Sequence, residues 1–168
     1  MINEIIRKRK SVRRYKQEKT VTDEQIKEIL EAAMLAPSAR NTRPWEFIVV
    51  RNQEILEKIV NLPNSHYSMV KPAGLAIVVC ADIEKQTGNF FPQDCAAATQ
   101  NILLQSAELN LGTCWCGVYP KEDKVEEFRE IFELPENIVP FCIIALGAPD
   151  EEFGSRGFYE ESKVKWIN

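Results

Sequence analysis

An unbroken run of apolar residues at positions 75–80 constrains the fold of this chain more than any other feature. Successive side chains of a strand point to opposite faces, so a strand with this sequence is buried on both faces. Residues 139–146 predict another strand, and residues 45–50 and 113–118 predict two more. A sheet built around such a strand needs a covering layer on each side.

Apolar residues at helical spacing predict the segments that provide this cover. Thr22 and Gln25 form a capping box at the start of one helix, which Pro37 brings to an end. We expect Asp94 to cap a long, alanine-rich helix and Gly112 to end it as a left-handed C-terminal cap. Shorter helices are predicted around Ile5 and at residues 53–61 and 121–132. Because strands alternate with helices, the fold class is α/β or α+β.

The chain has 168 residues, which fits a single domain spanning residues 1–168. Hydrophobic residues make up 45% and charged residues 27%, a composition that excludes disordered and low-complexity classes. No apolar run approaches the ~20 residues needed to cross a bilayer, and residues 1–4 do not resemble a signal peptide. We therefore expect a cytoplasmic protein with no membrane partner.

The five cysteines are an odd number and lie mostly in apolar stretches, which favours free thiols over a disulfide framework. Cys114 and Cys116 are too close together for a CxxC motif, and His66 is the only histidine, so no metal site is expected. The GxSxG, Walker and GxGxxG motifs are missing as well. We expect a cofactor, rather than a protein side chain, to supply the chemistry.

Positive charge is concentrated at the N-terminus of a chain whose net charge is -4. Residues 1–16 carry seven basic side chains against Glu4 alone, whereas the rest of the chain is strongly acidic. So short a basic segment indicates a local anion site, and a phosphate fits it best; a broad nucleic-acid surface would need many more Lys and Arg. The alternative is a solvated basic helix end without a ligand.

From Asp150 onward the chain becomes polar and loses any clear period, yet it keeps apolar side chains that a free tail would not need. We expect this tail to wrap onto the body of the protein or onto a partner subunit, rather than to be disordered. The apolar side chains are Phe153, Phe158, Tyr159, Trp166 and Ile167.

Five segments, in their order and spacing, resemble the FMN-dependent nitroreductase family over nearly the whole chain: residues 9–15, 36–47, 94–104, 111–117 and 144–147. The resemblance implies a mixed α+β fold with a central, mostly antiparallel sheet flanked by helices. It also implies a homodimer with two flavins at the interface and a C-terminal tail that wraps the partner. The link at residues 81–93 is short, so the chain is similar to a short, single-domain member with an open site.

The resemblance implies that the flavin-binding residues come from four parts of the chain. Arg9 and Ser11 would bind the phosphate, with Lys10 in the same segment and Arg13 closer to the ring. The loop with Pro37, Ser38, Ala39 and Asn41 would reach the flavin of the other subunit. Cys114, Trp115, Cys116 and Gly117 would lie along the ring, where a backbone N–H of Cys116 or Gly117 would face flavin N5. A C-terminal base, Arg156 or else Lys163, would complete the phosphate site.

Several of these positions have an ordinary structural reading as well. His66 or Tyr67 stands near the position where the family commonly has an Asn at the ring, but a lone His in a polar loop is often only solvated. The loop before residue 45 can be a plain turn. Cys116 is better explained as a buried structural thiol than as a nucleophile.

The function implied is that of an NAD(P)H-dependent FMN oxidoreductase with no catalytic side chain. A hydride passes from NAD(P)H to flavin N5, and an electron-poor small molecule, a nitroaromatic or a quinone, then takes the reducing equivalents by a ping-pong mechanism. Two alternatives stay open: a flavoenzyme with a dedicated reaction, such as reductive dehalogenation or flavin fragmentation, and a non-enzymatic flavin-binding protein.

Overall fold

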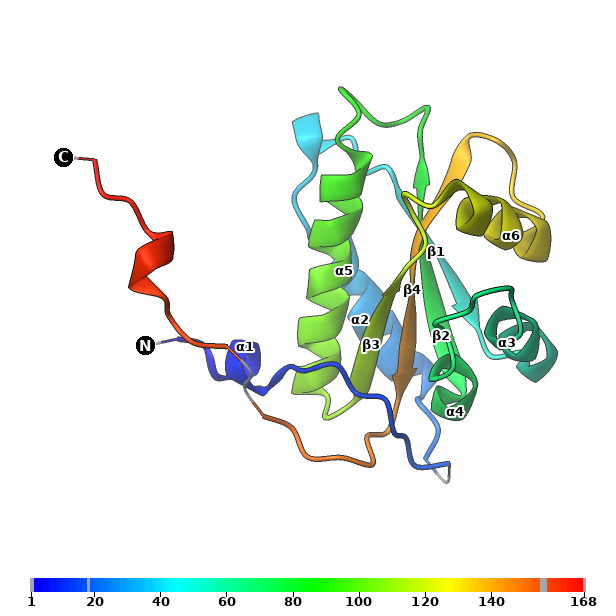
Figure 1. The fold of residues 1–168 in the computed structure, drawn as a ribbon, viewed down its shortest axis with the longest axis horizontal. Helices are drawn as coiled ribbons and strands as arrows, with labels where there is room; N and C mark the ends of the chain where they lie inside the picture. The colour runs from blue at the N-terminus through cyan, green and yellow to red at the C-terminus, as the bar shows by residue number, and fades with distance from the viewer. Residues whose placement is uncertain (1, 18, 155–156, 168) are drawn as a thin grey trace.

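The computed structural model describes residues 2–17, 19–154 and 157–167 and centres on a four-stranded antiparallel sheet (Figure 1). The strand order is β1-β2-β4-β3, and each neighbouring pair is antiparallel. These findings confirm the predicted α+β fold with its antiparallel sheet. The strands are β1 (Trp45–Val50), β2 (Leu75–Asp82), β3 (Gly112–Gly117) and β4 (Ile138–Gly147).

Helices cover both faces of this sheet (Figure 1). One face is covered by α2 (Asp23–Met34) and α5 (Phe91–Glu108), and the other by α3 (Gln53–Val60), α4 (Val70–Ala73) and α6 (Glu122–Phe132). Every residue of β2 and β4 is buried as a result. The core thus sits on both sides of the two central strands, as the apolar run at residues 75–80 requires.

The long helix α5 differs from its prediction at both ends. It begins at Phe91, with a proline in its first turn, and the side chain of Asp94 accepts a hydrogen bond from the backbone N–H of Ala39 (2.9 Å) instead of capping its own helix. At the other end, Asn110 takes the left-handed conformation (φ 58°), whereas Gly112 is the first residue of β3. Both corrections arise because tertiary contacts use residues that the sequence pattern assigned to local caps.

Gly112 has a packing role instead. A Cβ at this position would lie 2.8 Å from Cγ1 of Val12, so only glycine lets the N-terminal segment cross here. The segment follows α1 (Glu4–Lys8) and pairs with the free edge of β3, where Val12 N donates to Thr113 O (2.8 Å) and Ser11 forms a bridge with Thr113. The predicted basic segment is therefore held against the end of the sheet.

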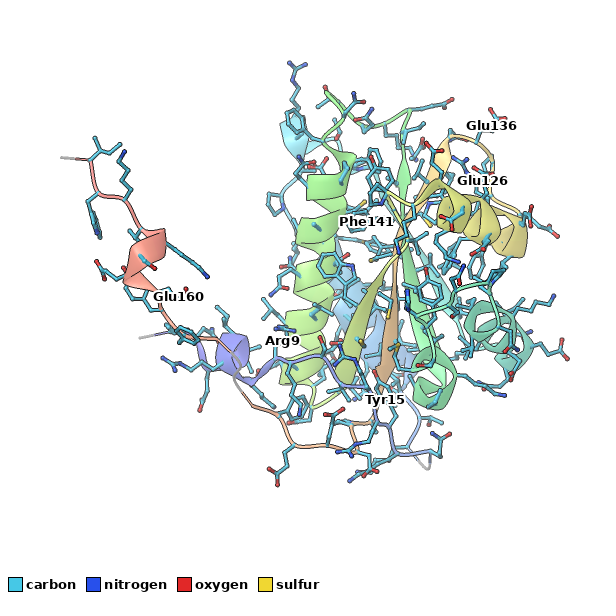
Figure 2. The ribbon with its side chains drawn as sticks, in the orientation of Figure 1. Arg9, Tyr15, Glu126, Glu136, Phe141 and Glu160 are labelled. Atoms are coloured by element: carbon cyan, nitrogen blue, oxygen red, sulfur yellow. The ribbon has the colours of Figure 1, made fainter. Side chains whose placement is uncertain are left out.

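The C-terminal tail passes α1 and extends away from the sheet (Figure 1). Figure 2 shows Glu160, next to the short helix η2 (Glu161–Lys163), away from the sheet and the helices that cover it. Phe158 is 83% exposed and Trp166 is 74% exposed. The start of the tail meets the N-terminal segment of its own chain, where Lys8 Nζ lies 5.0 Å from the centre of the Phe153 ring and residues 157–159 help to line a hollow beside α1. The exposed side chains further along leave a partner subunit as the other predicted surface.

None of the helices in the described residues is both long and apolar enough to span a bilayer.

Candidate functional site

The basic N-terminal segment lines a hollow of about 830 Å³ beside α1, which we call the cationic hollow. Its polar lining consists of Arg7, Arg9, Lys10, Ser11 and Arg13, and no carboxylate lines it among the described residues. The rest of the lining is Ile2 and Ile6 at the N-terminus and Gly157, Phe158 and Tyr159 of the tail. Arg9 lies between α1 and the end of α5 in Figure 2. Such a set of donors suits a phosphate, which arginine can bind through two parallel hydrogen bonds.

A second hollow, of about 430 Å³, lies at the C-terminal end of β3, and we call it the strand-end hollow. Arg13 lines this hollow as well as the cationic hollow, so the two meet at that side chain. The remaining lining is largely apolar and sulfur-bearing, which suits a flat conjugated ring more than a charged group. It consists of His66, Tyr67, Met69, Cys114, Trp115, Cys116, Gly117, Val118, Tyr119, Pro120 and Lys121.

Backbone groups of β3 point alternately toward β4 and toward the free edge of the sheet. Thr113 O accepts from Val12 N at the free edge, whereas Val118 N donates to Phe141 O on β4. By this alternation, the N–H of Gly117 faces the free edge and that of Cys116 faces β4. Of the two N–H groups predicted to face a ring, only that of Gly117 is therefore placed to do so.

Tyr67 holds the C-terminal end of β3 in place. Its hydroxyl donates to Gly117 O (3.1 Å), and its ring packs edge-on against Phe128 of α6 at a centroid distance of 5.5 Å. Burial is the main reason that the pKa of Tyr67 rises to about 12, so the hydroxyl keeps its proton at neutral pH. Tyr67 is thus held in the wall of the hollow, whereas the adjacent His66 is exposed.

Glu151 fixes the basic segment from the opposite side. Its carboxylate accepts hydrogen bonds from the backbone N–H of Arg13 (2.7 Å) and of Arg14 (3.2 Å) and pairs with Lys10 Nζ (3.1 Å). The backbone hydrogen bond from Arg13, followed by the side-chain hydrogen bond from Lys10, lowers the pKa of Glu151 to about 2. The ammonium of Lys10 is therefore already paired, and the side chain of Arg13 is set at the junction of the two hollows.

The two cysteines of β3 lie on one face of the strand because they alternate with Trp115, which packs against Phe141 at a centroid distance of 5.9 Å. All five cysteines are free and buried, as the sequence predicts. Hydrogen bonding with Cys114 and burial raise the pKa of Cys116 well above its usual range, and the same hydrogen bond lowers the pKa of Cys114 to about 7. A protonated thiol at position 116 agrees with a structural role and not with a nucleophilic one.

The structure brings together two of the four predicted groups of site residues. Arg9, Lys10, Ser11 and Arg13 line the cationic hollow, and His66 lies with residues 114–117 around the strand-end hollow. Pro37, Ser38, Ala39 and Asn41 line neither hollow of this chain; they lie in and before the short helix η1 (Ala39–Asn41), beside the start of α5. Lys163 is in the tail, where its Nζ pairs with Glu160 (2.7 Å), and Arg156 lies outside the described residues.

Sequence reasoning missed Glu151, Met69, Tyr119 and Lys121. Glu151 follows the last strand in a polar stretch and carries no pattern of its own, since its role depends on backbone N–H groups almost 140 residues earlier. The other three belong to loops at the strand-end hollow, and only the fold places them there. No three His, Cys, Asp or Glu side chains of the described chain gather in a way that could hold a metal ion.

The model of the nitroreductase family matches residues 6–68 and 62–148 of the chain. A protein of Methanothermobacter thermautotrophicus with the provisional name NADH dehydrogenase/NAD(P)H nitroreductase is 48% identical over 168 residues, which cover 97% of this chain and 86% of that one. A relative from Archaeoglobus fulgidus with the same provisional name is 46% identical over 90% of this chain and 86% of its own.

Solved structures resemble the chain over nearly its full length. An FMN-dependent nitroreductase of Clostridium difficile is 35% identical, covers 98% of each chain and has a TM-score of 0.86. A protein of Desulfovibrio desulfuricans, provisionally named a nitroreductase and solved in complex with FMN, is 29% identical, covers 98% of this chain and 95% of its own, and has a TM-score of 0.80.

The Glu151 contacts generate a prediction about stability and pH. Because the pKa of Glu151 in the folded protein is about 2, below its ordinary value, the ionised carboxylate stabilises the fold at neutral pH, and this stabilisation is lost as the pH falls through that range. We expect Glu151→Gln to lower the free energy of unfolding at pH 7 by about 1 kcal/mol, and the difference from wild type to shrink steadily as the pH falls below ~4.5.

Urea denaturation between pH 7 and pH 3 measures this difference, with Glu152→Gln as the control because Glu152 is the exposed neighbour. A Glu151→Gln deficit that is the same at every pH would contradict the role given to the charge.

Proposed function

The chain belongs to the nitroreductase family, and from this premise we propose that it is an FMN-dependent oxidoreductase that passes reducing equivalents from NAD(P)H to an electron-poor acceptor. The observation that carries the proposal is the pair of hollows that meet at Arg13, one lined by four basic side chains and the other mainly by aromatic and sulfur-bearing residues. FMN has a phosphate at one end and a flat ring at the other, which matches this pair of hollows. The names of the relatives, which include NAD(P)H nitroreductases and FMN-dependent proteins, support the same reaction class.

The described residues fit this cofactor in their donor chemistry. Arg9 and Ser11 supply a guanidinium and a hydroxyl for the phosphate, while Arg13, held by Glu151, supplies a positive charge near the ring. Lys10 lines the same hollow and adds charge, although its ammonium also pairs with Glu151. No second phosphate-binding fingerprint is found in the sequence, which favours a mononucleotide over a dinucleotide cofactor.

A flavin held by these residues would supply the redox chemistry, which is hydride uptake from NAD(P)H at its N5 and ping-pong transfer of the reducing equivalents to a nitroaromatic or a quinone. The chain contributes a fixed dipole, because the N–H of Gly117 at the free edge of β3 can donate to that nitrogen. Tyr67 keeps the Gly117 peptide in place through its hydrogen bond to the carbonyl oxygen. No side chain is required to act as a nucleophile or as a general acid.

A homodimer is part of the proposal because the single chain leaves its site incomplete. The loop with Pro37, Ser38 and Asn41 lies away from both hollows of its own chain, so it contributes only if it reaches the hollows of a second copy. The tail likewise exposes Phe158 and Trp166, which need a covering surface. Arg156 or Lys163 would then complete a phosphate site from this tail. Trp45 differs from these tail residues, because it is only 8% exposed in the single chain and needs no partner to cover it.

The absorption spectrum of the purified protein tests the cofactor directly. We expect bands near ~450 nm from an oxidised flavin that releases as FMN. Steady-state oxidation of NAD(P)H with a quinone or nitroaromatic then separates an enzyme from a flavin-binding protein without activity. A colourless protein that does not take up added FMN would refute the proposal.

Arg9 provides the sharpest test of the phosphate assignment. We expect Arg9→Ala to weaken FMN binding by about 1 to 3 kcal/mol, the range for a charge-assisted hydrogen bond. The matched control is Arg14→Ala, because Arg14 belongs to the same segment but its side chain lines neither hollow. Fluorescence titration of the stripped proteins with FMN measures both affinities. Equal affinities in the two variants would count against a phosphate at Arg9.

The dimer is tested by its mass in solution. We expect sedimentation equilibrium to give twice the chain mass of 19.3 kDa, because the loop and the tail each require a second copy. Removing residues 157–168 should then weaken both the dimer and the binding of FMN. A monomer that binds FMN as tightly as the full-length dimer would contradict a shared site.

Cys116 tests whether the flavin alone carries the chemistry. A serine keeps the size and the backbone of this position but removes the thiol, so we expect Cys116→Ser to keep NAD(P)H:quinone turnover within about tenfold of wild type, or ~1.4 kcal/mol in the barrier. The measurement is steady-state turnover per bound FMN. A loss of three orders of magnitude with FMN still bound would identify a catalytic thiol.

A further inference from the structure

The carboxyl group of Asp94 is buried in the first turn of α5, and no step of the proposed reaction uses it. Asp94 is only 5% exposed. Its Oδ1 accepts a hydrogen bond from the backbone N–H of Ala39 (2.9 Å), whereas its Oδ2 is buried without a hydrogen-bond partner among the described residues. A buried acid with so little pairing is a poor stabiliser of a fold. Its contact with Ala39 therefore points to a role in holding the loop at residues 37–43.

The backbone of this loop is strained. Arg40, Asn41 and Arg43 take the left-handed conformation, with φ values of 51°, 57° and 49°. Asparagine tolerates this region, but arginine seldom enters it, and such a backbone persists only where surrounding contacts impose it. A plain turn would use glycine at these positions. The loop thus has a fixed shape that the connection from α2 to β1 does not by itself require.

The contacts that impose this shape are few. Within the loop, the backbone N–H of Arg43 donates to Ser38 Oγ (2.9 Å), and Arg43 Nε donates to Asn41 Oδ1 (2.9 Å). For the part of the chain that the structure describes, Asp94 provides the only hydrogen bond between residues 37–43 and another element. This bond is made at Ala39, directly before the left-handed pair at residues 40 and 41. Asp94 therefore sets the position of the loop relative to α5.

The shape of the loop does not serve the hollows of its own chain. Pro37, Arg40, Asn41 and Arg43 are exposed, and none of them lines the cationic hollow or the strand-end hollow. A strained and anchored loop that faces outward is suited to contact another molecule. In the proposed homodimer, that molecule is the second copy of the chain.

We propose that Asp94 is a positioning residue that holds the loop at residues 37–43 in the shape needed at the FMN site of the second copy. The inference rests on the proposed function, because it requires FMN and a shared site. Asp94 itself does not touch the cofactor and acts through the N–H of Ala39. Each site of the dimer then depends on Arg9 of one chain and on Asp94 of the other.

Mixed dimers test this division directly. Two chains with different affinity tags are expressed together, one with Arg9→Ala and the other with Asp94→Ala. One site of the mixed dimer then carries both changes, whereas the other has an intact Arg9 and an intact loop. We expect fluorescence titration of the stripped mixed dimer to find one FMN site of wild-type affinity. In the Asp94→Ala homodimer, we expect every site to lose about tenfold or more, the effect of an N–H left without its partner.

Further variants separate this role from general destabilisation. Asp94→Asn keeps an acceptor oxygen, so we expect FMN affinity within about threefold of wild type. The matched control is Thr99→Ala, because Thr99 is a fully buried polar residue of the same helix whose hydroxyl contacts Cys142 Sγ (3.4 Å). We expect this control to stay within about threefold as well. Thermal melts identify any variant that is unfolded.

If Asp94→Ala does not fold, Ala39→Pro takes its place in the mixed dimer. Proline removes the same hydrogen bond from the donor side, and the extended backbone of Ser38 (φ -139°) is compatible with a following proline. We expect the same single site of wild-type affinity in the mixed dimer.

Several outcomes would overturn the inference. A mixed dimer with only weak sites would show that Asp94 acts within its own chain. An Asp94→Ala affinity within threefold of wild type, a loss in Asp94→Asn as large as in Asp94→Ala, or an equal loss in Thr99→Ala would remove the role of the hydrogen bond. A wild-type protein that does not bind FMN would refute the proposed function and this inference together, whereas normal wild-type binding beside a failed mixed dimer would refute the inference alone.

Discussion

The whole architecture depends on the burial of β2 and β4 on both faces. Strands without a polar face must lie in the middle of the sheet, and they force helices onto both sides of it. The edge positions then fall to β1 and β3, and only an edge strand has backbone groups free for another partner. At β3, Val12 pairs with the start of this edge, whereas the N–H of Gly117 faces the open edge at the end of the strand.

Much of this fold could be predicted from local pattern. All four strands are found within two residues of their predicted ends, and the capping box at Thr22 is present in full. The errors lie where one residue serves a distant segment. Asp94 binds the backbone of Ala39 rather than its own helix, and Gly112 is small because Val12 passes over it. Neither requirement leaves a signal at short range, so periodicity and cap rules assigned both residues to the wrong element.

The individual residues of the candidate site could be predicted from the sequence, but the contacts that bring them together could not. The charge pattern located Arg9 and Arg13, and the resemblance to a family located the residues of β3, but neither showed that Arg13 lines both hollows. Nor could a sequence pattern reveal the anchor of that segment, because Glu151 acts on backbone N–H groups that every residue other than proline carries. The loop at residues 37–41 stays a prediction, since one chain alone does not bring it to either hollow.

At the end of β3, the backbone N–H groups and the side chains point in different directions because of the regular alternation along the strand. The backbone of Gly117 faces the open edge, where a dipole can act on a ring, while the thiols of Cys114 and Cys116 face α4 and the core. Side chains at positions 114 and 116 can therefore vary without changing the direction of the Gly117 N–H. Arg13, which lines both hollows, places positive charge near each of them.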